Sequence, residues 1–168
     1  MNVYAYDRAA AVAYARKWAL GRNPAFYDFN DIGGDCTNFA SQCIFAGCGV
    51  MNYLPLYGWF YRSASDRTPS WTGVQFLHNF LVGNDGVGPF AQVVPLEQAE
   101  VGDVIQLGDG RGDFFHSPVA VAIRPRSRGK ITEDDILIAA HTYDALDRTL
   151  SSYNARQYRV LHILGYRK

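Results

Sequence analysis

Patterns typical of helices and patterns typical of strands occupy different parts of this sequence. Apolar residues recur at helical spacing before residue 83, whereas short runs rich in Val and Ile dominate from Val93 onward. Helices are expected at about 8–20, 36–47 and 74–82, and strands at about 104–107, 117–123, 136–140 and 158–164. Segregated helices and strands are typical of α+β proteins. We therefore expect N-terminal helices packed on a C-terminal antiparallel sheet.

The size and charge of the chain limit the classes of function that can be expected of it. A chain of 168 residues, 48% of them apolar, is expected to form a single domain over residues 1–168. The formal net charge is zero, which gives no support for binding to nucleic acid. No apolar run approaches the roughly 20 residues that cross a bilayer, so no membrane span is expected. The N-terminal segment lacks the pattern of a secretory signal, and localisation stays unknown.

Cys36 is placed at the expected start of the second helix. Its apolar stripe comprises Cys36, Phe39, Ala40, Cys43, Ile44 and Gly47. A thiol in the first turn of a helix lies close to unpaired backbone N–H groups, which can lower its pKa and make it a nucleophile. The preceding glycines, Gly33 and Gly34, would let the backbone approach a substrate. The alternative is a buried structural thiol, which is the interpretation we give to Cys43.

The three cysteines do not indicate a disulfide or a metal site. Cys36 and Cys43 would lie two helical turns apart, at roughly 10 Å between Cα atoms, which is too far for a disulfide. Cys48 has no evident partner. No paired spacing typical of a zinc site is present, and no metal or organic cofactor is expected.

Two histidines could serve a cysteine nucleophile. His116 precedes one expected strand and His141 follows the next. If these strands form a hairpin in which Ala120 is opposite Leu137, His116 is opposite His141 and both lie at the same end. Small residues, Ala120, Ala122 and Ala139, would then line the face that receives the Cys36 helix. His78 and His162 lie within apolar segments and are expected to be structural.

Other residues near the cysteine have simpler expected roles. Asp35 would raise the pKa of a neighbouring thiol, so helix capping is its expected role. Asp144 is a second candidate to orient a histidine.

The segment 51–72 is rich in aromatic residues and lacks a clear period, which favours an elaborated surface loop or a groove wall.

Several strings in the sequence together resemble the putative amidase domain family, related to the NlpC-type and CHAP peptidases of the papain-like superfamily. They are Gly-Gly-Asp-Cys-Thr-Asn-Phe-Ala-Ser-Gln-Cys at 33–43, Ser-Trp at 70–71, Gly-Asp-Val-Ile-Gln at 102–106, Phe-His-Ser at 115–117 and Ala-Ala-His-Thr at 139–142. The first string is highly specific, and the shorter ones follow in the expected order. The resemblance implies a papain-like fold.

The resemblance also implies a mechanism. It makes Cys36 the nucleophile, His116 its base and His141 the group that orients His116, in an enzyme that cleaves amide bonds through a thioester acyl-enzyme. It further implies a peptide or amide substrate, with peptidoglycan-derived peptides as one class. Two alternatives stay open, namely an acyltransferase and a catalytically silent peptide-binding module of the same fold.

Overall fold

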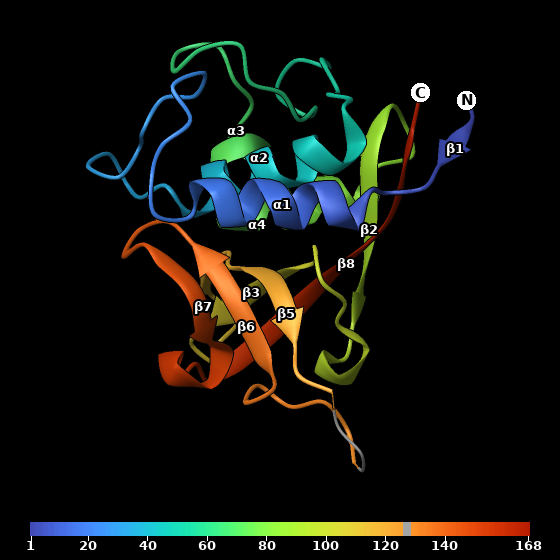
Figure 1. Ribbon diagram of the computed structural model, residues 1–168. Helices are drawn as coiled ribbons and strands as arrows, with labels where there is room; N and C mark the ends of the chain where they lie inside the picture. The colour runs from blue at the N-terminus through green and yellow to red at the C-terminus, as the bar shows by residue number, and fades with distance from the viewer. Residues whose placement is uncertain (126–128) are drawn as a thin grey trace.

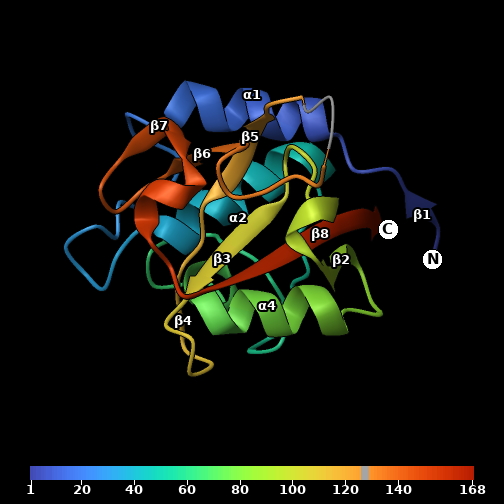
Figure 2. The ribbon, with the colours of Figure 1, turned by 90° about the horizontal axis from the view of Figure 1, so that it is seen from below.

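The helices lie together on one side of the molecule. The computed structural model describes residues 1–125 and 129–168. In these residues the helices are α1 (Arg8–Trp18), α2 (Cys36–Cys48), α3 (Pro69–Thr72) and α4 (Val74–Gly83). They form a layer above a curled sheet, with α2 between α1 and α4 (Figures 1 and 2). No helix within this part of the chain is long and apolar enough to cross a membrane.

Local signals place the ends of the two longer helices. Asp7 precedes α1, and its carboxylate accepts a hydrogen bond from the Ala10 backbone N–H at 2.9 Å. Gly49 follows α2 in the left-handed conformation, with φ of 64°, and its N–H donates to the Phe45 carbonyl. The three expected helices are therefore confirmed.

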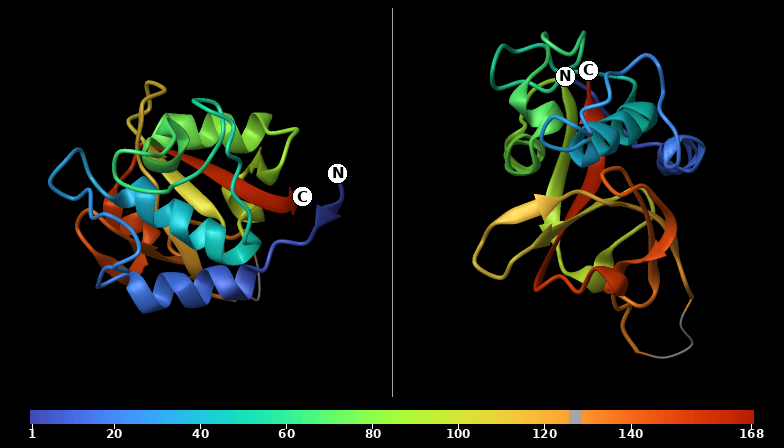
Figure 3. Two further views of the ribbon diagram at one scale, coloured as in Figure 1. Left: turned by 90° about the horizontal axis from the view of Figure 1, so that it is seen from above. Right: turned by 90° about the vertical axis from the view of Figure 1, so that its left-hand side faces the viewer.

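The strands form a single antiparallel sheet that curls on itself (Figure 3). They are β1 (Val3–Tyr4), β2 (Gly88–Val94), β3 (Val104–Gly108), β4 (Phe114–His116), β5 (Val119–Ile123), β6 (Ile136–Ala140), β7 (Ala145–Thr149) and β8 (Gln157–Arg167). The principal order is β1-β8-β3-β5-β6-β7, while β2 also pairs with β8 and β4 with β3. The chain therefore has the expected α+β architecture, with the helices mainly N-terminal and the antiparallel sheet mainly C-terminal.

The expected register between β5 and β6 is wrong by one residue at Ala120 and by two at Ala122. Ala120 is opposite Ile138 rather than Leu137, and an extra residue of β5 between Ala120 and Ala122 shifts the pairing once more, so that Ala122 is opposite Leu137. His116 does not belong to this hairpin at all, since it lies in β4 and pairs with Leu107 of β3. Part of the hairpin connection, residues 126–128, lies outside the described residues.

Two apolar cores lie on the two faces of the sheet. One lies between the helices and the sheet and includes Phe39, Cys43 and Ala139. The other is enclosed by the curled part of the sheet and includes Ala120. The expected alanine face is therefore divided, because the extra residue in β5 turns Ala120 away from α2. Cys43 is fully buried in the first core, as expected for a structural thiol.

The aromatic segment 51–72 contributes to the core rather than only to the surface. Trp59 and Trp71 are fully buried, and their rings lie 4.7 Å apart. Ser41 on α2 connects them, because its hydroxyl accepts from Trp59 Nε1 and donates to the Trp71 carbonyl. The expectation of a groove wall is therefore wrong for these two residues. The rest of the segment 51–72 includes exposed side chains such as Tyr57.

Candidate active site

Cys36 lies at the first position of α2, where this helix meets the sheet. Its thiol is buried, with 8% of the residue exposed. The three cysteines of the chain are free thiols, and Cys43 and Cys48 lie further along the same helix. The two glycines before the helix have φ of 87° and 100°, which explains why residues without a side chain occupy positions 33 and 34.

Asp35 occupies the N-cap position of α2 but does not cap the helix with its side chain. Its buried carboxylate accepts from the Phe29 backbone N–H at 2.9 Å, from Asn38 Nδ2 at 2.8 Å and from His141 Nδ1 at 2.5 Å. The predicted capping role is therefore wrong, because three other donors use the carboxylate. The first-turn amides of α2 are left without this acceptor, which keeps them available to a developing negative charge.

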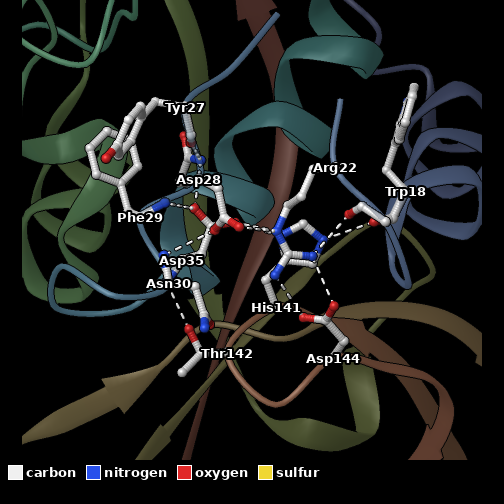
Figure 4. Close-up of polar contacts among 12 residues, drawn as sticks. Trp18, Arg22, Tyr27, Asp28, Phe29, Asn30, Asp35, His141, Thr142 and Asp144 are labelled. Carbon is white, nitrogen blue, oxygen red and sulfur yellow. Dashed lines mark hydrogen bonds and ion pairs between the residues drawn. The ribbon is translucent and has the colours of Figure 1, made fainter. Parts of the chain in front are cut away.

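His141 connects the start of α2 with the end of α1 (Figure 4). Its Nδ1 contacts Asp35, and its Nε2 lies 2.8 Å from the carbonyl oxygen of Trp18, the last residue of α1. Both distances are those of hydrogen bonds, so the ring bridges the start of α2 and the end of α1. Its ring also stacks on the ring of Phe39, with 4.1 Å between the two ring centroids. The predicted contact between His141 and His116 is therefore wrong.

His116 ends β4 and directly precedes Ser117, whose backbone amide is a hydrogen-bond partner of the Cys36 thiol. His116 is 8% exposed, and its ring centroid lies 5.4 Å from that of Tyr153. Within the described part of the chain, no hydrogen bond engages either of its ring nitrogens. Burial, together with the positive charge of Arg148, lowers the pKa of His116 to about 4. The ring is therefore neutral near pH 7 and can accept a proton.

Neighbouring hydroxyl groups join the Cys36 helix to the His116 strand. Thr37 Oγ1 and Ser117 Oγ lie 3.2 Å apart, and both side chains are buried. Thr37 and Ser117 directly follow Cys36 and His116 in the sequence. The contact therefore fixes the backbones of the two candidate catalytic residues against each other.

Burial dominates the acidity of the Cys36 thiol. It raises the pKa of Cys36, an effect opposed by hydrogen bonding from Thr37 and from the Ser117 backbone amide, and the Asp35 charge raises the pKa further. The expectation that the helix start lowers this pKa is therefore wrong. Near neutral pH the pair consists of a protonated thiol and a neutral imidazole.

A strained turn after β6 completes the surroundings of the site. Thr142 and Tyr143 have φ of 60° and 63°, a left-handed conformation that costs a residue with a side chain about 1–2 kcal/mol. Thr142 Oγ1 accepts from the Asp35 backbone N–H at 2.7 Å. Such strain is found at functional sites, where the surrounding contacts hold it in place. Thr142 belongs to the string at 139–142 that contributes to the family resemblance, whereas no sequence pattern indicates that Tyr143 or Tyr153 belongs to a site.

The other candidate residues have structural partners. Asp144 binds the guanidinium of Arg22 at 2.8 and 3.1 Å, so it does not orient His116. His78 lies on the surface of α4 with Asn79 as a partner. His162 lies 2.8 Å from a buried oxygen of Asp103. The expected structural roles of His78 and His162 agree with these contacts.

Comparison with known proteins assigns the chain to a family. Residues 5–164 match the family described as a putative amidase domain. The chain therefore belongs to this family, whose description points to hydrolysis of amide bonds.

A curated protein is similar to nearly the whole chain. The chain is 34% identical over 160 residues to the uncharacterized protein YhbB of Bacillus subtilis (strain 168), which covers 94% of this chain and 48% of that protein. The chain thus spans about half the length of this relative. No solved structure matches.

Proposed function

We propose that this chain hydrolyses amide bonds through a thioester on Cys36, with His116 as general base and then general acid. The observation that carries the proposal is the 3.2 Å contact between Thr37 and Ser117, which holds the start of the Cys36 helix against the end of the His116 strand. Membership of the amidase family supports the class of reaction. The helix that carries Cys36 and the sheet that carries His116 agree with a papain-like arrangement.

The protonation states suggest how the reaction begins. Because the thiol is protonated and the imidazole is neutral at rest, the proton passes from Cys36 Sγ to His116 as sulfur attacks the substrate carbonyl. The amides at the start of α2, including that of Cys36, are suited to stabilise the oxyanion that forms. His116 then donates the proton to the leaving amine nitrogen. Water, deprotonated by His116, finally attacks the thioester, and His116 returns the proton to Cys36 Sγ as the acid is released.

His141 has a positioning role in this proposal. It binds Asp35, which directly precedes Cys36, and the last carbonyl group of α1. His141 and Asp35 therefore connect the end of α1 to the start of α2. The pair thereby fixes the start of the helix that carries the nucleophile.

The proposal is tested by comparing three variants on the same substrates. Muropeptides, the substrates that the resemblance implies, and a general peptide library are incubated with the protein, and the products are identified by mass spectrometry. Cys36→Ala is expected to abolish hydrolysis, and His116→Ala to slow it by about 10²–10⁴-fold. Cys48→Ala, at the other end of the same helix, is the control and should retain activity.

Two outcomes would contradict the proposal. Hydrolysis that persists in Cys36→Ala would exclude the thioester. A folded wild-type protein that cleaves no amide and whose Cys36 is not labelled by any thiol-directed inhibitor would favour the silent binding module.

A further inference from the structure

A small hollow opens beside the candidate catalytic pair. Its volume is about 200 Å³, and its wall comprises Phe115, His116, Thr142, Tyr143 and Tyr153. These residues come from β4, from the strained turn after β6 and from the 3-10 helix η2 (Leu150–Tyr153). The volume is below the roughly 300–1,000 Å³ of sites that enclose a whole small-molecule ligand. The hollow therefore suits one side chain of a larger substrate.

The hollow is adjacent to the proposed chemistry. His116 forms part of its wall, and Thr142 binds the backbone of Asp35, which directly precedes Cys36. The Tyr153 ring packs on His116. A substrate side chain in the hollow would thus belong to a residue close to the scissile carbonyl.

Apart from the His116 ring, the wall presents mainly apolar groups to the hollow. Thr142 Oγ1 is already used by the Asp35 N–H, and the Tyr153 hydroxyl oxygen is buried, with no hydrogen-bond partner in the described part of the chain. The Arg148 guanidinium lies over the Tyr153 ring, 3.7 Å from its centroid, and donates to Ser152. This guanidinium is only a donor, so the hydroxyl proton of Tyr153 has no acceptor there.

No carboxylate, lysine or arginine lies among the residues of the wall. A charged side chain placed in the hollow would lose its hydration without gaining a partner of opposite charge. An apolar side chain would instead be removed from water against three aromatic rings, those of Phe115, Tyr143 and Tyr153. The wall thus favours apolar side chains over charged ones.

We propose that this hollow is the subsite for an uncharged apolar side chain next to the scissile amide. The inference rests on the proposed function, because it assumes that Cys36 attacks that amide. It names the substrates as peptides or acyl amides with an aliphatic or aromatic side chain near the cleaved bond. Side chains that carry a carboxylate or an amine are selected against at this position.

Peptidyl chloromethyl ketones test the subsite directly, because Cys36 Sγ loses its proton to a base, displaces chloride and forms a stable thioether. Two series carry Ala, Leu, Phe, Asp or Lys at the first or at the second position from the reactive carbon. The second-order rate of labelling is measured by mass spectrometry, with fragmentation to assign the thioether to Cys36. In one of the two series, the probes that carry Leu or Phe are expected to label Cys36 about tenfold or more faster than the probes that carry Asp or Lys.

Two substitutions in the wall test whether the preference for apolar side chains depends on the hollow. Tyr143 is 88% exposed and has a positive φ that Asn tolerates well, so Tyr143→Asn should fold normally while it removes one aromatic ring. Phe115→Ala removes a second ring. Each substitution is expected to reduce the ratio of the labelling rates, that of the Leu or Phe probe over that of the Asp or Lys probe, by about three- to tenfold. Tyr57→Asn, at an exposed position outside the wall of this hollow, is the control and should leave this ratio unchanged.

Different results would contradict the proposed subsite and the proposed function. Equal rates in both series, or faster labelling by Asp or Lys, would overturn the subsite while Cys36 remains the nucleophile. A preference that neither wall substitution reduces would also overturn it. The absence of Cys36 labelling by every probe would instead overturn the proposed function, and the subsite with it.

Discussion

His141 Nδ1 lies 2.5 Å from Asp35 Oδ2, and both side chains are almost completely buried. The contact joins the end of β6 to the residue before Cys36. The other ring nitrogen of His141 faces the Trp18 carbonyl, so both ring nitrogens have hydrogen-bond partners. Removing one partner of a buried polar pair is costly, because the group that remains keeps its desolvation penalty without its hydrogen bond.

Asp35→Asn is therefore expected to destabilise the protein by about 3–5 kcal/mol. Asn has a single acceptor oxygen in place of the two carboxylate oxygens that contact Phe29, Asn38 and His141, so at least one of these buried groups loses its partner. The free energy of unfolding is measured by urea denaturation. Asp144→Asn is the control, because Asp144 is partly exposed and should cost about 1 kcal/mol or less.

A double-mutant cycle separates this pair from a general loss of packing. His141→Gln and Asp35→Asn are measured singly and together. The double variant should cost less than the sum of the single variants by about 1–3 kcal/mol, because each substitution already breaks the pair. Additive costs would show that the two side chains do not stabilise one another.

The helices could be predicted from the sequence because their signals are local. Asp7 and Gly49 mark the ends of α1 and α2 within a few residues of the helices themselves. The position of Cys36 at the start of α2 followed from the same signals. The partners of Asp35 could not be predicted, because Phe29, Asn38 and His141 meet there only once the chain is folded.

The register around His116 depends on contacts between distant segments. Pro118 separates β4 from β5, and its carbonyl accepts from the Ile105 N–H of β3. The irregularity between Ala120 and Ala122 then shifts the pairing with β6. Regular alternation, which the prediction assumed, contains no information about either feature. The same holds for Tyr153, whose place beside His116 results from tertiary packing.

His116 should make the stability of the protein depend on pH. Its pKa is lowered to about 4 in the folded state, against the ordinary value of 6.5. Below pH 6.5 the unfolded chain binds a proton that the folded protein excludes, so stability is complete above this value and falls as the pH decreases towards 4. The loss at pH 4.5 is expected to be roughly 2–3 kcal/mol.

Urea denaturation at pH 7 and at pH 4.5 measures this effect in the wild type and in His116→Gln. The variant has no titrating group at this position, so it should lose less stability between the two pH values. His78→Gln is the control, since His78 is partly exposed and its lowered pKa contributes less. If His116→Gln and the wild type lose the same free energy of unfolding, another group is responsible.

The glycines before Cys36 provide a matched pair for testing how the start of α2 is positioned. Both have positive φ, so Ala at either position is strained by about 1–2 kcal/mol. A Cβ at Gly33 meets open space, whereas a Cβ at Gly34 would lie 3.1 Å from Thr142 Oγ1, the atom that accepts from the Asp35 N–H. Gly34→Ala should therefore be the more destabilising substitution, and it should also slow the labelling of Cys36 by a chloromethyl ketone. Equal stability and equal labelling rates in the two variants would show that the contact with Thr142 does not position the nucleophile.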